Sequence, residues 1–100
     1  MTLEVYKEAG KFPNSELYSL TSQIRRACYS IPMNIAEGCG KSSDAEFARF
    51  LDMSAGSASE LDYQLLLVKD IGFIQLEVYQ YLIEKLNHIR RILTNLIKNI

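Results

Sequence analysis

The last quarter of the chain carries an apolar repeat that commits it to a long helix. Apolar side chains follow one another in alternating steps of three and four residues at Tyr79, Leu82, Leu86, Ile89, Leu93, Leu96 and Ile100. This spacing is typical of a helix in a coiled coil or a helical bundle. A second row lies beside the first, at Leu76, Ile83 and Ile97. The apolar stripe is therefore wide enough to contact more than one neighbouring helix.

The middle of the chain predicts a second long helix. Its repeat falls at Phe47, Leu51, Ser54, Ala58, Leu61, Leu65 and Val68. Ser43 and Glu46 have the spacing of a capping box at its start, and Gly72 closes it. The run "SAGSAS" at residues 54–59 has small side chains in a helix that otherwise keeps its period. We expect a neighbouring backbone to approach closely there.

Two more helices are predicted upstream. One has its apolar positions at Leu17, Leu20, Ile24, Ala27, Ile31 and Ile35. Asn14 or Ser15 would be its N-cap, and Gly38 and Gly40 would end it. The other, residues 1–9, has room for only about two and a half turns at ~3.6 residues per turn.

These patterns predict one domain, residues 1–100, of the all-α class. No strand-type alternation of useful length is present, and connections such as "GCGKSS" are short. Short connections favour consecutive helices that run in opposite directions. We therefore predict an antiparallel up-down-up-down four-helix bundle whose first helix is short.

Charge and composition limit the classes of function. The net charge is -1 and the pI about 5.8, which argues against wholesale nucleic-acid or membrane binding. The charge is uneven, because residues 41–80 hold three basic and seven acidic side chains, whereas residues 81–100 hold four basic and one acidic. The start of the chain resembles no secretory signal, and no apolar run could span a membrane. We expect a cytoplasmic protein.

The stretch "IPMNIAEG", residues 31–38, interrupts the upstream helix with a proline. Either the helix breaks at Ser30 and a new segment starts near Pro32, or one kinked helix continues through it. The apolar spacing favours the continuous helix. Asn34 could satisfy freed carbonyl groups or bridge to a facing helix. Glu37, near the helix C-terminus, should have a basic partner among Arg25, Arg26 and Lys41; a ligand site at Asn34 and Glu37 is the alternative.

Several of these stretches together carry a family resemblance. They are "SQIRR" at 22–26, "SIP" at 30–32, "NIAEG" at 34–38 and the small-residue run. The chain closely resembles the four-helix-bundle proteins encoded in intervening sequences of bacterial 23S rRNA genes. The resemblance marks Pro32, Asn34, Glu37 and Gly38 as a structural motif and implies a homo-oligomer, a pentamer. The family is also similar to the accessory variability determinant of diversity-generating retroelements, which binds reverse transcriptase and nucleic acid through basic surface.

Catalytic and metal-binding signatures are weak. A nucleophile pair of Cys28 or Cys39 with His88, the one histidine, has no orienting motif beside it. The cysteines lie eleven residues apart, too far along one helix for a disulfide, and match no zinc spacing. Glu84 and His88 offer at most two ligands, and "EGCGK" follows a helix rather than a strand. We expect free thiols, no cofactor, no metal and no enzymatic activity.

Basic residues are the candidates for contact with a partner. They are Arg25, Arg26, Lys41, Arg90, Arg91 and Lys98. Members of a doublet point about 100° apart on a helix, so at least one of each pair should face solvent or an interface. One hypothesis is a scaffold that associates with RNA, DNA or a nucleic-acid-handling protein. The alternative is a protein–protein scaffold without nucleic-acid contact, in which the arginines pair with acids of residues 44–70.

Overall fold

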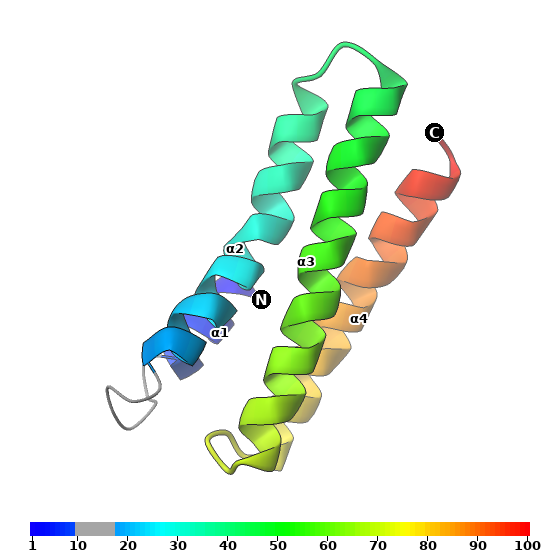
Figure 1. Ribbon diagram of the computed structural model, residues 1–100. Coiled ribbons are helices and arrows are strands. Elements are labelled where there is room, and N and C mark those ends of the chain that lie inside the picture. Colours follow the sequence, from blue (N-terminus) through cyan, green and yellow to red (C-terminus); the bar gives the residue numbers. More distant parts are fainter. Residues whose placement is uncertain (10–17) are drawn as a thin grey trace.

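Four helices make up the fold in a computed structural model of the chain (Figure 1). The structure describes residues 1–9 and 18–100. The helices are α1 (Thr2–Ala9), α2 (Tyr18–Cys39), α3 (Asp44–Asp70) and α4 (Leu76–Lys98). None of the described residues forms a strand, so the predicted all-α class is confirmed. The expected caps Asn14 and Ser15 lie outside the described residues.

The three long helices lie side by side along a molecule of 44 × 24 × 18 Å. A turn at one end joins α2 to α3, which returns beside α2, and a turn at the opposite end leads into α4 (Figure 1). The short α1 packs beside α2, and the N-terminus lies partway along the bundle rather than at its end. None of the described helices is long and apolar enough to cross a membrane.

Local signals define the ends of α3. Ser43 is its N-cap, and its Oγ accepts a hydrogen bond of 3.2 Å from the Glu46 amide, as the capping-box spacing predicted. At the other end, Gly72 adopts a φ of +85°, a left-handed conformation that favours glycine. Phe73 then donates its amide to the Val68 carbonyl at 2.9 Å. The chain can thus turn sharply into α4.

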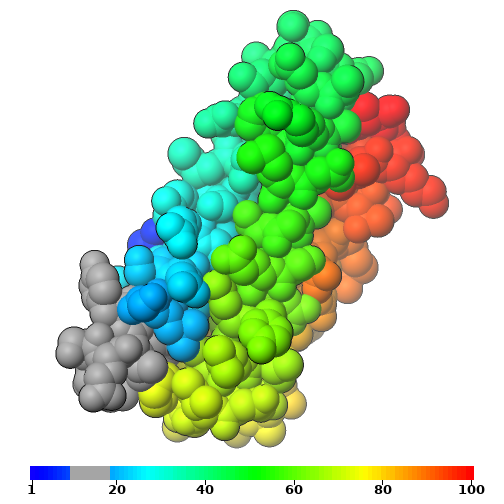
Figure 2. All heavy atoms as spheres, viewed as in Figure 1, coloured from blue at the N-terminus to red at the C-terminus, as the bar shows by residue number. Residues whose placement is uncertain are grey.

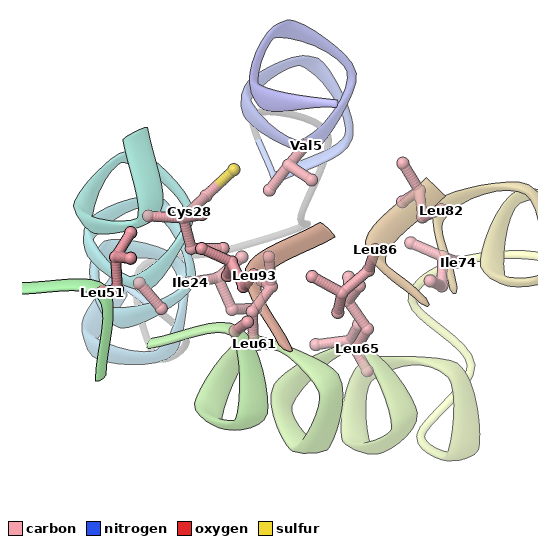
Figure 3. Packing of buried hydrophobic residues seen from close by; sticks show 14 residues of the cluster. Val5, Ile24, Cys28, Leu51, Leu61, Leu65, Ile74, Leu82, Leu86 and Leu93 are labelled. Atoms are coloured by element: carbon pink, nitrogen blue, oxygen red, sulfur yellow. The ribbon is translucent and has the colours of Figure 1, made fainter. Parts of the chain in front are cut away.

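The core runs along the bundle axis and receives side chains from every helix (Figure 3). Val5 of α1 and Ile24 of α2 meet Leu61 and Leu65 of α3 and Leu86 of α4. These five side chains are almost completely buried. Burial of a leucine or isoleucine contributes about 1.5–3 kcal/mol relative to an exposed position. Ile24, Leu61, Leu65 and Leu86 all lie on the predicted apolar faces, so these parts of the faces form the core.

The short α1 leaves part of α4 uncovered. In the first half of α4, Leu82 and Leu86 are buried and Ile89 is half-buried. In the second half, Leu93 stays buried against its neighbours, but Leu96 and Ile100 of the same predicted seam are exposed. The apolar stripe therefore continues beyond the reach of α1.

The small-residue run divides between two sides of α3. Ser54 and Ala58 are fully buried, and the Ser54 Oγ donates a 2.8 Å hydrogen bond to the Ile31 carbonyl of α2. This contact confirms the expected close approach of a backbone. Gly56 faces outward, and a Cβ built on it would meet no atom within 4 Å. The expectation of close contact is therefore wrong for Gly56 within one chain.

Candidate functional site

Two side chains donate hydrogen bonds to the backbone carbonyls of the two residues before Pro32. α2 is continuous through Pro32, so the alternative of a break at Ser30 is wrong. Asn34 Nδ2 donates a 2.9 Å hydrogen bond to the Ser30 carbonyl of its own helix. The carbonyl that Pro32 leaves without its helical donor is that of Cys28, so this bond supports the backbone beside the proline rather than the freed carbonyl itself. Ser54 serves the adjacent Ile31 carbonyl from α3. Because proline lacks an N–H, helix hydrogen bonding is interrupted here, and these side-chain donors support the backbone around it.

Gly38 and Glu37 behave differently from the expectation. α2 runs through Gly38 to Cys39, so Gly38 does not end the helix. Gly38 is buried, and a Cβ at this position would lie 2.9 Å from Phe47 Cδ1 and 3.0 Å from Phe50 Cβ. Glycine therefore permits α2 to approach α3. Glu37 is exposed and forms no ion pair with any residue that the structure describes, so the expected basic partner is absent there.

Among the described residues, Arg25 and Arg90 are the candidate basic residues whose side chains donate hydrogen bonds within the protein. Arg25 lies over the Tyr6 ring at 5.4 Å and donates to the Tyr6 carbonyl at 3.3 Å, which anchors α1 to α2. Arg90 pairs with Asp62 of α3 at 2.6 Å and donates to the Ser59 hydroxyl at 3.3 Å. The predicted pairing of arginines with the acidic helix is thus confirmed for Arg90, whereas Arg25 uses an aromatic partner instead.

The other four candidates are exposed. Arg26, Lys41, Arg91 and Lys98 form no ion pair within the described part of the chain. Lys41 lies over the Phe50 ring at 5.2 Å, where Arg49 also stacks at 5.1 Å. One member of each arginine doublet is therefore available to a partner, as predicted. The six residues do not form one patch, because they are divided among α2, the turn after it and α4.

Arg90 and Arg91 border a shallow hollow of about 380 Å³ on α4. Asn87, Thr94 and Asn95 complete its lining. Thr94 Oγ1 donates to the Arg90 carbonyl at 2.9 Å, which fixes this hydroxyl on the helix surface. No motif in the sequence marks these three polar residues. Their steps of three and four residues around Arg91 place them on the same side of the helix as its guanidinium.

A second hollow, of about 450 Å³, lies where the N-terminus meets α4. Its lining includes Met1, Glu84, Lys85 and His88. The Met1 ammonium pairs with Glu4 at 2.7 Å, and Lys85 lies over the Tyr81 ring at 4.8 Å. Among the described residues, no group of three or more histidine, cysteine or acidic side chains could hold a metal ion. Glu84 and His88 therefore have no third ligand there.

The two cysteines are free, as expected, and differ in environment. Cys28 is fully buried and Cys39 is exposed. Burial raises the pKa of the Cys28 thiol above its ordinary value of 9.0, and a hydrogen bond with Thr2 acts in the opposite direction. A nucleophilic cysteine needs the reverse shift, toward the thiolate. Cys28 is therefore a core residue rather than a catalytic one.

This environment predicts a pH dependence of stability. The unfolded thiol ionises near pH 9, whereas the raised pKa keeps a larger fraction of Cys28 protonated in the folded protein. The folded state then binds more protons, so its stability falls as the pH rises above about 9. We expect Cys28→Ala to reduce this loss of stability at high pH, measured by urea unfolding between pH 7 and 10.

The two thiols should also differ in accessibility. At pH 8, a thiol reagent should modify the exposed Cys39 at once and the buried Cys28 only after unfolding. Equally rapid modification of both would contradict the burial of Cys28.

The comparisons with known proteins agree with this architecture. The sequence matches the profile of the family described as 23S rRNA-intervening sequence protein over residues 1–95. No curated protein matches it at a significant level. A crystal structure of a protein of unknown function from the S23 ribosomal protein family of Bacteroides thetaiotaomicron is similar, with 26% sequence identity and a TM-score of 0.82. The match covers 97% of this chain and 88% of that one. On the extent of the profile match, supported by this shared fold, the chain belongs to the 23S rRNA-intervening sequence protein family.

Proposed function

We propose that this protein is a non-enzymatic scaffold that self-assembles and binds RNA, or an RNA-handling partner, through α4. The observation that carries the RNA contact is the hollow beside Arg91, a cation that no described residue neutralises. Lys98 lies two turns further along the helix and is also exposed. Asn87, Thr94 and Asn95 add hydrogen-bonding groups between and beside the two charges.

Chemistry favours a phosphate backbone as the ligand of this face. Arginine and lysine bind phosphates, while asparagine and threonine add neutral hydrogen bonds that position a strand. The second half of α4 is the most basic part of a chain that is slightly acidic overall, so any nucleic-acid contact should be local. The description of the family refers to intervening sequences of 23S rRNA, which makes RNA the first polyanion to test.

The test is a gel shift with a labelled single-stranded RNA of about 30 nucleotides at low salt. We expect the full chain to retain the probe and Arg91→Ala/Lys98→Ala to weaken retention at least about tenfold. Each lost phosphate contact should also lower the slope of log affinity against log salt by about one. The double variant should therefore have a slope smaller by about two.

A matched control removes two positive charges elsewhere. Lys7→Ala/Arg49→Ala has the same net charge as the test variant but leaves α4 intact. It should retain the RNA like the unmodified protein, apart from a small general electrostatic effect. No shift of the probe at low salt, or an equal loss in both double variants, would rule out the α4 face as an RNA contact.

A protein–protein scaffold without nucleic-acid contact is the second candidate. It is favoured by the contacts that Arg25 and Arg90 make within the chain and by exposed apolar side chains such as Leu96 and Met53.

In both candidates we propose an antiparallel bundle that forms a homopentamer in the cytoplasm. Light scattering should then give about five times the 11.4 kDa of one chain. Assembly without RNA retention would leave the second candidate standing.

A further inference from the structure

The outer faces of α2 and α3 carry two exposed stripes that the bundle core does not use. The α2 stripe consists of Ser22, Arg26, Tyr29, Met33 and Ala36; the α3 stripe consists of Met53, Gly56, Glu60, Tyr63 and Leu67. In both stripes the steps alternate between three and four residues. Tyr29 and Met33 are 41% and 54% exposed, and Met53 and Tyr63 are 47% and 68% exposed. Tyrosine, methionine and arginine are residue types enriched in protein–protein interfaces.

Gly56 is the least expected member of these stripes. A glycine within a helix destabilises it relative to alanine, because glycine loses more backbone conformational entropy on folding. At Gly38 the packing against Phe47 explains the glycine, but nothing in the described structure lies within 4 Å of a Cβ at Gly56. In Figure 2, α3 runs uncovered along the face turned to the viewer. A small residue on an open helix face permits close approach by a helix from outside the chain.

Contacts within one chain fix which residues lie at the same height along the bundle. The Ser54 hydroxyl meets the Ile31 carbonyl, and Gly38 lies against Phe47, so rising numbers on α2 match falling numbers on α3. Tyr29 lies two residues before Ile31, and Gly56 lies two residues after Ser54. The largest side chain of the α2 stripe is therefore level with the gap in the α3 stripe.

The charges of the stripes are complementary at the matching height. Arg26 lies five residues before Ile31, level with Ser59 and next to Glu60. Arg26 forms no ion pair with a described residue, and Glu60 Oε1 accepts only a 3.3 Å hydrogen bond from Gln64 of its own helix. An arginine in an interface can bind a carboxylate with paired hydrogen bonds.

We propose that the α2 stripe of one copy packs against the α3 stripe of the next copy, with Tyr29 over Gly56 and Arg26 facing Glu60. We propose that this contact repeats head-to-tail from copy to copy, an arrangement that generates a ring when the rotation closes. In a ring whose axis runs along the bundles, neighbouring copies share the same heights, and the matched residues meet. This inference rests on the self-assembly proposed above and adds the surfaces that produce it.

Charge reversal tests the pairing directly. Arg26→Glu and Glu60→Arg should each weaken assembly at least about tenfold, measured as mass by light scattering over a dilution series. Arg26→Glu/Glu60→Arg should restore the mass, because the pair is then re-formed with its charges exchanged. Lys7→Glu on α1, which lies outside both stripes, is the matched control and should leave the mass unchanged. Loss of assembly in both single variants without recovery in the double variant would overturn the pairing.

Gly56→Leu gives an independent test of the packing. Its helix content should be unchanged, because leucine is a good helix former, but its mass should fall toward that of one chain. Tyr29→Ala/Gly56→Leu should regain assembly, since the leucine then occupies the space that the tyrosine leaves. An oligomer whose mass none of these variants alters would refute this interface and leave self-assembly intact. An unmodified protein that stays monomeric at all concentrations would refute both.

Discussion

Leu86→Ala should lower the free energy of unfolding by about 3 kcal/mol, whereas Leu96→Ala on the same helix should lower it by about 1 kcal/mol or less. Both leucines belong to the same apolar repeat of α4. Leu86 is 0% exposed, so its truncation leaves a cavity that the rigid surroundings cannot fill. Leu96 is 40% exposed beyond the end of α1, where solvent fills the space that its side chain leaves.

Urea unfolding followed by circular dichroism, at one protein concentration, measures both effects. The slope of the free energy of unfolding against urea concentration should be unchanged in each variant, so the shift in the unfolding midpoint reports the change in stability alone. A third variant, Leu93→Ala, is buried in the same half of α4 as Leu96 and should resemble Leu86→Ala. Equal losses for Leu86→Ala and Leu96→Ala would show that the second half of α4 is covered as fully as the first.

Gly38→Leu should lower the free energy of unfolding by about 3 kcal/mol, at the upper end of the cost of overpacking a core. A Cβ at Gly38 would already lie 2.9 Å from the Phe47 ring and 3.0 Å from the Phe50 Cβ. The remaining atoms of a leucine would force α2 away from α3. This separation would also lengthen the nearby hydrogen bond from Ser54 to the Ile31 carbonyl.

Gly40→Ala is the matched control for this effect. Gly40 lies two residues further on, and a Cβ there would meet only the Glu37 carbonyl oxygen at an ordinary 3.5 Å. Alanine should stabilise the protein by about 0.5 kcal/mol through the lower entropy of the unfolded chain. Thermal and urea unfolding of both variants check the prediction. A harmless Gly38→Leu would mean that the two helices are not held in contact at this point.

The sequence predicted the helices well because their signals are local. The steps of three and four residues located α3 and α4, and Ser43 with Glu46 placed the start of α3 correctly. Gly38 was misjudged, since a glycine near a helix end resembles a stop signal. Its actual partner, Phe47, lies on another helix. A distinction between a capping glycine and a packing glycine requires the facing helix to be known.

The candidate site could be predicted only in part from the sequence. The doublets predicted one free arginine each, and Arg26 and Arg91 are indeed exposed. Which arginine is engaged depends on long-range contacts, of Arg25 with Tyr6 and of Arg90 with Asp62. Asn87, Thr94 and Asn95 carry no signal alone, because polar residues on a helix are ordinarily just solvated.

The sequence by itself determined the helical class, the long helices and the apolar faces, because the period of a helix is visible in residues that lie only three or four positions apart. Only the tertiary structure decided how far each face is covered. The apolar repeat of α4 is uniform from Leu82 to Ile100, yet α1 reaches only its first half. The burial of a side chain depends on which other helix lies opposite it. The same holds for whether a charged residue finds a partner and whether a glycine packs against a neighbour. For that reason, the roles of Leu96 and Gly56 depend on which helix faces each of them.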